Sequence, residues 1–387
     1  MSTLAKLRHR GGWKPAILQD LVFFQRGFDI TKAEQKPGNI PVVSSSGVNS
    51  YHSEAKVDGP GVVIGRKGSL GTVHYVDGPY WPHDTTLWSK DLKGNLPRFV
   101  YYFLHTLGLE RYDVGNSNPT LNRNHIHRLD VLLPEYRIQE RIVDILSAYD
   151  GLIENNRRRI QLLEQAARLL YKEWFVRLRF PGHEHTKIVN GIPEGWEKKK
   201  IADVCETIGG GTPSTRVAEY WDGDITWVVP SDITRNDCLV LLNSGRKITE
   251  KGLRESSARM VPPETILMTS RASVGFFALM DYAVCTNQGF INIIPHDENM
   301  RMYLLFNLMS RVEEIRSNAK GTTYPEISKS RFRDMDIVVP ADAIVYEFSG
   351  FASNIIHQLR TLKRSVFKLT KARDILLPRL MNGEIAV

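Results

Sequence analysis

Two long segments of the 387-residue chain repeat apolar residues every three or four positions, the spacing of one face of an α-helix. The first covers about residues 135–176, and the second begins near residue 341. The predicted seam of the first is Ile138, Ile142, Ile145, Tyr149, Leu152, Asn156, Arg159 or Ile160, Leu163, Ala166 and Leu170. That of the second is Ile344, Phe348, Phe351, Ile355, Leu362, Leu369, Ala372 and Leu376. Both segments are therefore predicted to be helices with a heptad seam.

A seam of this kind has to be buried against another surface. Two such helices in one chain are predicted to pair with each other as an antiparallel coiled coil. The alternatives are a coiled coil between two copies of the chain, or a helix lying on its own domain. If Asn156 is buried in the seam, it would fix the register in which the two helices pair. The alternative is that the helix frays at this point and Asn156 faces solvent. A helix over residues 135–176 would be roughly 60 Å long.

The segments before each helix are rich in glycine, proline and short β-branched runs, which indicates strands joined by turns. One short helix is predicted in each, at residues 98–107 and 300–316. The predicted fold class is therefore α+β. Its order is a mixed domain at residues 1–134, a spacer helix at 135–180, a linker and second mixed domain at 181–340, and a C-terminal helix at 341–387.

The two mixed domains repeat one sequence plan. Trp13 recurs as Trp196, at an offset of 196 − 13 = 183. Arg66 to Gly71 recurs as Arg271 to Gly275, with the glycines 275 − 71 = 204 apart. Pro119-Thr120-Leu121 recurs as Pro325-Glu326-Ile327 at offset 206. Antiparallel helices would relate the two copies by a pseudo-twofold axis, so the chain could present two reading domains to two half-sites of duplex DNA.

Composition narrows this picture. With 42% hydrophobic and 24% charged residues, the chain has a globular balance and is not disordered. No apolar run suits a membrane span or a signal peptide, which places the protein in the cytoplasm. Three cysteines without zinc spacing fit a reducing compartment. The net charge of +8 favours an anionic partner, but residues 188–340 carry 18 − 20 = −2, so any DNA-binding cations there must gather on one face.

Three stretches resemble one known family. Gly209-Gly210-Gly211-Thr212-Pro213-Ser214, followed by Tyr220-Trp221 and Ile225 to Val228, resembles the opening of target-recognition domains in type I restriction-modification specificity subunits. Ile138-Gln139-Glu140-Arg141-Ile142-Val143 resembles the helical spacer of that family, and Leu376 to Ile385 its C-terminal tail. Ala341 to Glu347 departs from the pattern by lacking the Gln-Glu-Arg run, so a partner contact made by that run is expected to be weaker there.

The resemblance implies a function. Each mixed domain would read one half of a bipartite DNA target, and the helices would set the spacer and dock two modification subunits. Those subunits would carry S-adenosylmethionine and methylate adenine. Two restriction (motor) subunits using ATP and Mg²⁺ are compatible with the same family, and this chain itself is expected to hold no cofactor and no metal.

Loops that approach DNA need small residues for access and donors for phosphates and base edges. In the second copy the candidates are Gly210, Gly211, Thr212, Ser214, Arg271, Ser273, Thr322, Thr323, Tyr324, Lys329 and Arg331. Backbone amides of the glycine-rich loop are expected to form an anion-binding nest, and the alternative is a plain turn after a strand. In the first copy the candidates are Arg66, Lys67, Ser69, Ser45, Ser46, Asn118, Thr120, Asn122 and Arg123. For these the alternatives are shared structural turns and solvated surface loops.

No catalytic motif accompanies these loops. The sequence has no Gly-x-x-x-x-Gly-Lys-Ser/Thr loop, and its Pro262-Pro263 pair follows Val261, not the Asn or Asp of adenine methylases. The sequence therefore predicts a DNA-specificity subunit that is not an enzyme. A stand-alone nuclease or methylase and a scaffold that reads no sequence are the alternatives.

Overall fold

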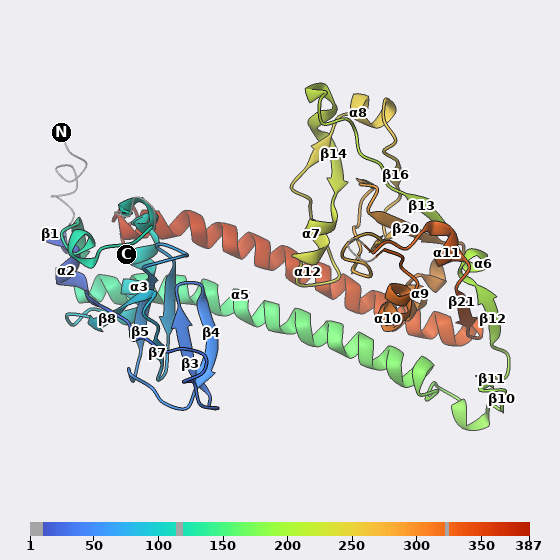
Figure 1. The fold of residues 1–387 in the computed structure, drawn as a ribbon, viewed down its shortest axis with the longest axis horizontal. Coiled ribbons are helices and arrows are strands. Elements are labelled where there is room, and N and C mark those ends of the chain that lie inside the picture. The colour runs from blue at the N-terminus through green and yellow to red at the C-terminus, as the bar shows by residue number, and fades with distance from the viewer. Residues whose placement is uncertain (1–10, 114–118, 322–324) are drawn as a thin grey trace. The chain divides into compact units, whose positions relative to one another are not determined.

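The structure, a computed structural model, describes residues 11–113, 119–321 and 325–387 (Figure 1). It divides into two compact units, each with one strand-rich domain and part of each long helix. Unit 1 comprises Met1–Leu152 and Lys368–Val387, and unit 2 comprises Ile153–Phe367. Each unit has a hydrophobic core of its own.

Unit 1 is built on two small sheets and a two-stranded ribbon. Its strands are β1 (Trp13–Ile17), β2 (Phe23–Arg26), β3 (Ile40–Ser44), β4 (Gly47–His52), β5 (Gly61–Gly65), β6 (Val73–Val76), β7 (Trp81–Pro82), β8 (Thr86–Asp91) and β9 (Asp130–Pro134). One sheet has the order β2-β8-β5-β6 with every pair antiparallel. The other has the order β4-β3-β7, and β1 pairs with β9. Its short helices are α2 (Leu18–Leu21), α3 (Pro97–His105) and α4 (Arg123–Ile126).

The centre of the first sheet is a continuous apolar run. All five residues of β5 are buried, as expected for a strand covered on both faces. Helix α3 contacts β5 and β6 (Figure 1). It begins with Pro97, whose missing N–H is not needed in the first turn of a helix. The helix predicted at residues 98–107 is confirmed by α3.

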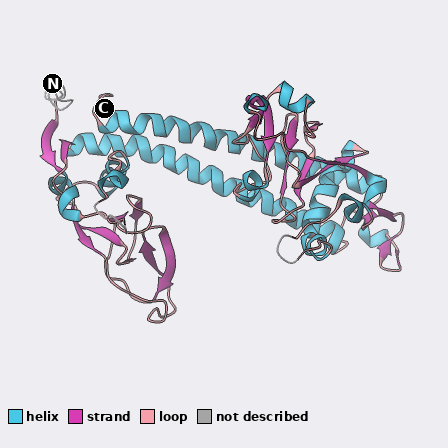
Figure 2. Ribbon diagram, turned by 45° about the horizontal axis from the view of Figure 1, so that its top comes forward, coloured by secondary structure: helices cyan, strands magenta, loops and turns pink. Residues whose placement is uncertain are grey.

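Unit 2 repeats this architecture. Its strands are β10 (Ile188–Val189), β11 (Ile192–Pro193), β12 (Glu197–Lys200), β13 (Cys205–Gly209), β14 (Trp221–Val228), β15 (Lys247–Ile248), β16 (Met260–Val261), β17 (Ile266–Thr269), β18 (Phe277–Ala278), β19 (Val284–Thr286), β20 (Phe290–Pro295) and β21 (Asp336–Val339). The sheet β13-β20-β17-β18 corresponds to β2-β8-β5-β6. The sheet β15-β14-β19-β16 corresponds to β4-β3-β7 with one added strand, and β12 pairs with β21 as β1 does with β9. Figure 2 shows strands and helices in both units, and the predicted mixed, duplicated fold is confirmed.

The helices of unit 2 correct one prediction. Its short helices are α6 (Ile201–Val204), α7 (Pro230–Thr234), α8 (Glu250–Arg254), α9 (Arg301–Ser310), α10 (Val312–Ser317) and α11 (Lys329–Arg333). The sequence predicts one helix over residues 300–316, but the structure has α9 and α10 separated by Arg311. The backbone of Arg311 has φ −110° and ψ 22°, which lies outside the helical region and breaks the segment in two.

The two long helices are α5 (Tyr136–Tyr171), followed by a π-helical turn at Lys172–Val176, and α12 (Asp342–Met381). Within unit 2 they contact each other. Asn156 is buried and donates from Nδ2 to Ser365 Oγ at 3.3 Å, and the rings of Tyr171 and Phe348 are 5.9 Å apart. Because the residue numbers rise along one helix as they fall along the other, the two segments are antiparallel in this unit. Asn156 therefore lies in the interface and does not face solvent.

The structure corrects the predicted seam of both long helices. At several positions the buried residue is the neighbour of the one that the spacing predicted. Leu152 and Phe351 are half exposed, at 51% and 50%, although the sequence assigned them to the seam. Ala166 is also exposed. The buried positions of α5 are Gln139, Ile142, Leu146, Ile153, Asn156, Ile160, Ala167 and Tyr171, and those of α12 include Val345, Phe348, Ala352, Ile356, Leu359 and Leu362. Leu152 and Ile153 are adjacent and both apolar, so either of them fits a spacing of three or four residues. The spacing alone therefore does not tell which of the two is buried.

No helix in the described part of the chain has the length and apolarity needed to cross a membrane.

Candidate nucleic-acid interface

In unit 1 the structure brings two of the predicted loops together. Lys67 and Thr120 form an isolated antiparallel β-bridge, and the N–H of Leu121 donates to the carbonyl oxygen of Arg66 at 2.9 Å. The loop that contains Ser69 is thereby joined to the segment that enters α4. In that segment the side chain of Asn122 caps α4 by accepting from Asn124 N at 2.9 Å, and Arg123 is exposed.

The serine loop between β3 and β4 lies beside them, but its residues differ in role. Ser45 is buried, and its carbonyl oxygen accepts a hydrogen bond from Thr72 Oγ1 at 2.5 Å. Its N–H donates to Thr85 Oγ1 at 3.3 Å. These contacts favour a structural role for Ser45. Ser46 is exposed, and its hydroxyl lies 3.0 Å from that of Ser44.

A group of charges lies at the end of β2. Arg26 Nη2 forms ion pairs with Asp29 at 3.2 Å and with Asp84 at 3.1 Å. Arg66 Nη1 donates to the carbonyl oxygen of Asp84 at 3.3 Å. Partial burial, followed by the nearby charge of Arg26, lowers the pKa of Arg66. Two cations and two carboxylates therefore meet at this edge of unit 1 and partly neutralise one another.

Unit 2 has the same loop pairing. Arg271 bridges to Glu326, and the N–H of Ile327 donates to Ser270 O at 3.0 Å, just as Leu121 donates to Arg66 O. The residue equivalent to Arg271 is therefore Lys67, at offset 271 − 67 = 204, which is also the offset between Gly71 and Gly275.

The same loop contains a strained alanine. Ala272 has a φ of 60° where the equivalent Gly68 has 76°. A left-handed conformation suits glycine and costs an alanine about 1 kcal/mol. Arg271 beside it forms an ion pair with Glu326 at 2.8 Å, whereas the first copy has Thr120 at the position of that carboxylate. Ser273 is exposed next to these residues.

The glycine-rich loop is held tightly against the domain. A methyl group on Gly210 would clash with the backbone oxygen of Asn287, and one on Gly211 with that of Ser257. The N–H of Gly211 already donates to Thr286 O at 2.9 Å. This amide is therefore not available for the anion-binding nest that the sequence predicted. The glycines are required by close packing of backbone on backbone.

The rest of that loop is fixed by side chains. Thr212 Oγ1 donates to Gln288, and Ser214 is exposed. Trp227 Nε1 donates to Gly211 O at 2.9 Å, and Trp221 Nε1 donates to Ser214 O at 3.1 Å. Two indole rings thus anchor the loop, one at Gly211 and the other at Ser214.

Lys329 brings a cation to the start of the same loop. A methyl group on Gly209 would lie 3.1 Å from Lys329 Nζ, so the absence of a side chain at Gly209 makes room for the ammonium group. Lys329 opens α11 as Arg123 opens α4, at offset 329 − 123 = 206. Arg331 is turned inward and donates to Asn318 O at 3.1 Å. Four further candidates, Asn118, Thr322, Thr323 and Tyr324, lie outside the described residues.

One residue near this loop was missed. Arg246 is exposed, with its guanidinium carbon 4.0 Å from the ring centroid of Trp221 and 5.2 Å from that of Trp227. Both tryptophans belong to the stretch that resembles the opening of a target-recognition domain. No short-range pattern connects them with an arginine about twenty residues further on.

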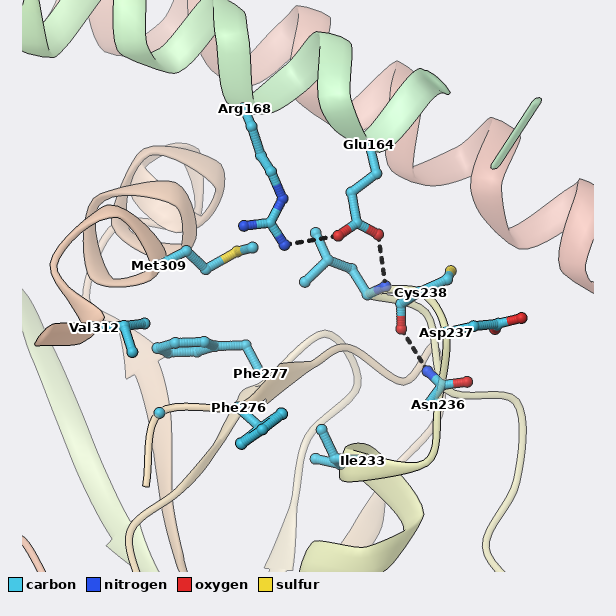
Figure 3. A pocket seen from close by; sticks show the side chains of 12 residues that line it. Glu164, Arg168, Ile233, Asn236, Asp237, Cys238, Phe276, Phe277, Met309 and Val312 are labelled. Atoms are coloured by element: carbon cyan, nitrogen blue, oxygen red, sulfur yellow. Dashed lines mark hydrogen bonds and ion pairs between the residues drawn. The ribbon is translucent and has the colours of Figure 1, made fainter. Parts of the chain in front are cut away.

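Polar contacts attach the strand-rich domain of unit 2 to both helices. On α5, Glu164 accepts hydrogen bonds from Arg168 Nη2 at 2.7 Å and from Leu239 N at 3.1 Å (Figure 3). These residues line a cavity of about 270 Å³ between α5 and the loop at residues 236–239. On α12, Arg360 Nη2 donates to Glu264 at 2.7 Å and its Nε lies 3.6 Å from Asp281.

The same attachment includes two more cations of α12. Arg364 pairs with Asp281, and Lys363 pairs with Asp237. Burial alone would raise the pKa of Asp237, but the hydrogen bond and charge of Lys363 lower it. Glu264, Asp281 and Asp237, on three separate loops of the domain, thus all form ion pairs with α12. These pairs fix the domain on that helix.

Neither unit shows metal chemistry in the residues described. Among them, no group of three or more histidine, cysteine or carboxylate side chains could hold an ion. The three cysteines are buried, and burial raises the pKa of each thiol, to about 12 for Cys205 and about 11 for Cys238 and Cys285. They are therefore core residues, and their thiols are expected to react slowly.

Comparison with known families agrees with this geometry. Residues 11–165 and 193–373 each match the family described as the type I restriction modification DNA specificity domain. The two matches cover most of the chain and contain one strand-rich copy each. The chain belongs to this family. The resemblance predicted from the sequence is confirmed, and the family is one of DNA specificity and not of catalysis.

Individual specificity subunits match different shares of the chain. That of the type I restriction enzyme MjaIX from Methanocaldococcus jannaschii is 41% identical over 155 residues, which are 40% of this chain and 36% of the relative. The match thus spans little more than a third of that relative's length. That of HindI from Haemophilus influenzae is 26% identical over 360 residues, covering 75% of this chain and 78% of the relative.

A solved structure of the family shares the fold. The S subunit of a type I restriction-modification system from M. genitalium gives a TM-score of 0.67 at 15% identity, covering 95% of this chain and 96% of that one. At this identity the likeness concerns the fold alone.

Proposed function

We propose that this chain is the sequence-reading subunit of a type I restriction-modification complex, and that each strand-rich domain reads one half of a bipartite DNA target. One observation carries the proposal. Both domains join the same two loops by the same backbone hydrogen bonds, Leu121 to Arg66 and Ile327 to Ser270. The backbone frame is shared, while the side chains on it differ. Two equal frames with different side chains suit two half-sites of different sequence.

The partners follow from the family and from the exposed faces of the helices. Leu162 and Leu169 on α5 are 55% and 60% exposed, and such apolar side chains support the docking of a protein partner. We assign these partners as two modification subunits that carry S-adenosylmethionine, with two restriction subunits using ATP and Mg²⁺ in complexes that also cleave. This chain is assigned no cofactor. A cytoplasmic location, with access to chromosomal DNA, belongs to the same proposal.

The test is co-expression with a modification subunit of the same system, followed by long-read mapping of methyladenine in host DNA. A single motif of two short half-sites around a fixed run of unread bases is expected. An intact complex that methylates nothing would favour a scaffold. Methylation by this chain without a partner would mean that it contains an active site of its own.

A matched pair of variants tests whether each domain reads one half. Arg123 and Lys329 are equivalent exposed cations at the starts of α4 and α11. Arg123→Ala and Lys329→Ala should each impair methylation through a different domain, and the double variant should combine both losses. If both single variants change the same half-site, the assignment of one domain to each half is wrong.

A further inference from the structure

Arg246 lies on a surface of two tryptophan rings that also anchor the Gly209–Ser214 loop. Its guanidinium carbon is 4.0 Å from the centroid of Trp221 and 5.2 Å from that of Trp227. The two rings are nearly perpendicular, at 82°, with centroids 5.0 Å apart. Cation–π attraction is strongest for indole rings, so this side chain has a preferred position although it is exposed.

The backbone of Arg246 is fixed as well. Its carbonyl oxygen accepts from Trp227 N at 3.1 Å, and its N–H donates to Ser244 Oγ at 3.2 Å. Ser244 is buried and its hydroxyl lies 2.8 Å from both Trp227 O and Asp232 Oδ2. With the main chain and the guanidinium both held, little conformational freedom remains to be lost on binding.

The N–H groups of the Arg246 guanidinium form no ion pair with a carboxylate in the described residues. In the parts of unit 2 that the structure describes, no carboxylate lies within ion-pair distance of Arg246. Two acids of the same domain have other partners, since Glu219 pairs with Lys251 and Glu255 accepts from Tyr220 at 2.9 Å. Arg271, by contrast, is paired with Glu326. Arg246 is therefore a held, exposed cation whose N–H groups remain available.

We propose that Arg246 is a specificity-determining residue that reads a guanine edge in the half-site bound by unit 2. The planar fork of a guanidinium donates two parallel hydrogen bonds to guanine O6 and N7, an arrangement that an ammonium group cannot reproduce. Trp221 and Trp227 are its positioning residues. Their rings contact the guanidinium group, and their indole N–H groups donate to the glycine-rich loop. The inference rests on the proposed function and deepens it.

The experiment begins with the motif mapped for the wild-type complex, and then compares Arg246→Ala, Arg246→Lys and Arg254→Ala. Arg254→Ala removes the same charge from the same domain, at the end of α8, and in the described part of the chain the cation over both indole rings is Arg246 and not Arg254. Both Arg246 variants should relax one G·C pair of one half-site to other bases and leave the other half-site unchanged. On duplexes of that motif, discrimination at this pair should fall roughly 5–150-fold. Arg254→Ala should leave the motif unchanged.

Three outcomes would overturn the inference. If Arg246→Lys keeps the motif, the contact is to phosphate and not to a base. If Arg246→Ala lowers the affinity for DNA equally for all sequences, and the affinity depends less steeply on salt concentration, the contact is again to phosphate and not to a base. If Arg246→Ala changes nothing, the residue does not touch DNA. An unchanged second half-site shows that each variant folds and assembles, and a wild-type complex without a bipartite motif would refute the parent proposal as well.

Discussion

The ion pair between Arg360 and Glu264 yields the sharpest stability prediction. Arg360 is 13% exposed at its side chain and Glu264 25%, and the Nη2–Oε1 distance is 2.7 Å. Arg360→Met keeps most of the apolar stem but leaves Glu264 without this partner, while Asp281 keeps Arg364. A hydrogen bond to a charged group contributes about 1.5–3 kcal/mol, and partial exposure of Glu264 reduces the expected loss to about 2 kcal/mol.

For a domain of this size, that loss corresponds to a fall of roughly 4–8 °C in the unfolding temperature. Calorimetry of the full chain measures it, and hydrogen exchange should place the loosening at the loops around Glu264 and Asp281. Arg364→Met is the matched control, because Arg364 is 53% exposed and surface pairs contribute about 0–1 kcal/mol.

A double variant, Arg360→Met with Glu264→Gln, should recover much of the loss by removing the unpaired carboxylate. Equal shifts for Arg360→Met and Arg364→Met would refute the reasoning that burial decides the strength of these pairs.

Three further results are expected. Ala272→Gly should raise the free energy of unfolding by about 1 kcal/mol in denaturant titrations, because φ is 60° there and the equivalent Gly68 adopts 76°; a loss of stability would contradict the strain. Gly210→Ala should lower the unfolding temperature, since its methyl group would meet Asn287 O, whereas Gly245→Ala, with open space around it, should be nearly neutral. The raised thiol pKa values keep the cysteines protonated below about pH 10, so the native chain should resist alkylation at pH 8 and react after unfolding, as mass spectrometry would show. The cysteines concerned are Cys205, Cys238 and Cys285.

The long helices could be predicted because their period is a local property of the sequence. Which of two adjacent apolar residues is buried is not local. Phe351 has the larger side chain, yet Ala352 is the buried one, because the other surfaces packed around the helix decide that choice. The spacing of apolar residues therefore predicted which segments are helices, but it did not predict which of two adjacent residues is buried in the seam.

The candidate site shows the same limit. The loops were found by composition and by repetition, which a single sequence displays. Their pairing depends on a β-bridge between Lys67 and Thr120, more than fifty residues apart, and such contacts leave no local pattern. The anion-binding nest predicted for the glycine-rich loop does not form at Gly211 for a related reason. Gly211 looks like an open anion-binding turn until Thr286 is seen to accept its N–H.

The ribbons β1–β9 and β12–β21 have a consequence for how this protein can change over generations. Trp13 pairs with Pro134, and Glu197 pairs with Val339, so the chain enters and leaves each domain at neighbouring points. A domain whose ends leave side by side can be exchanged as a cassette with little strain on the segments that flank it. Recombination at two short junctions would thus give the chain a new target in one step and leave its helices untouched.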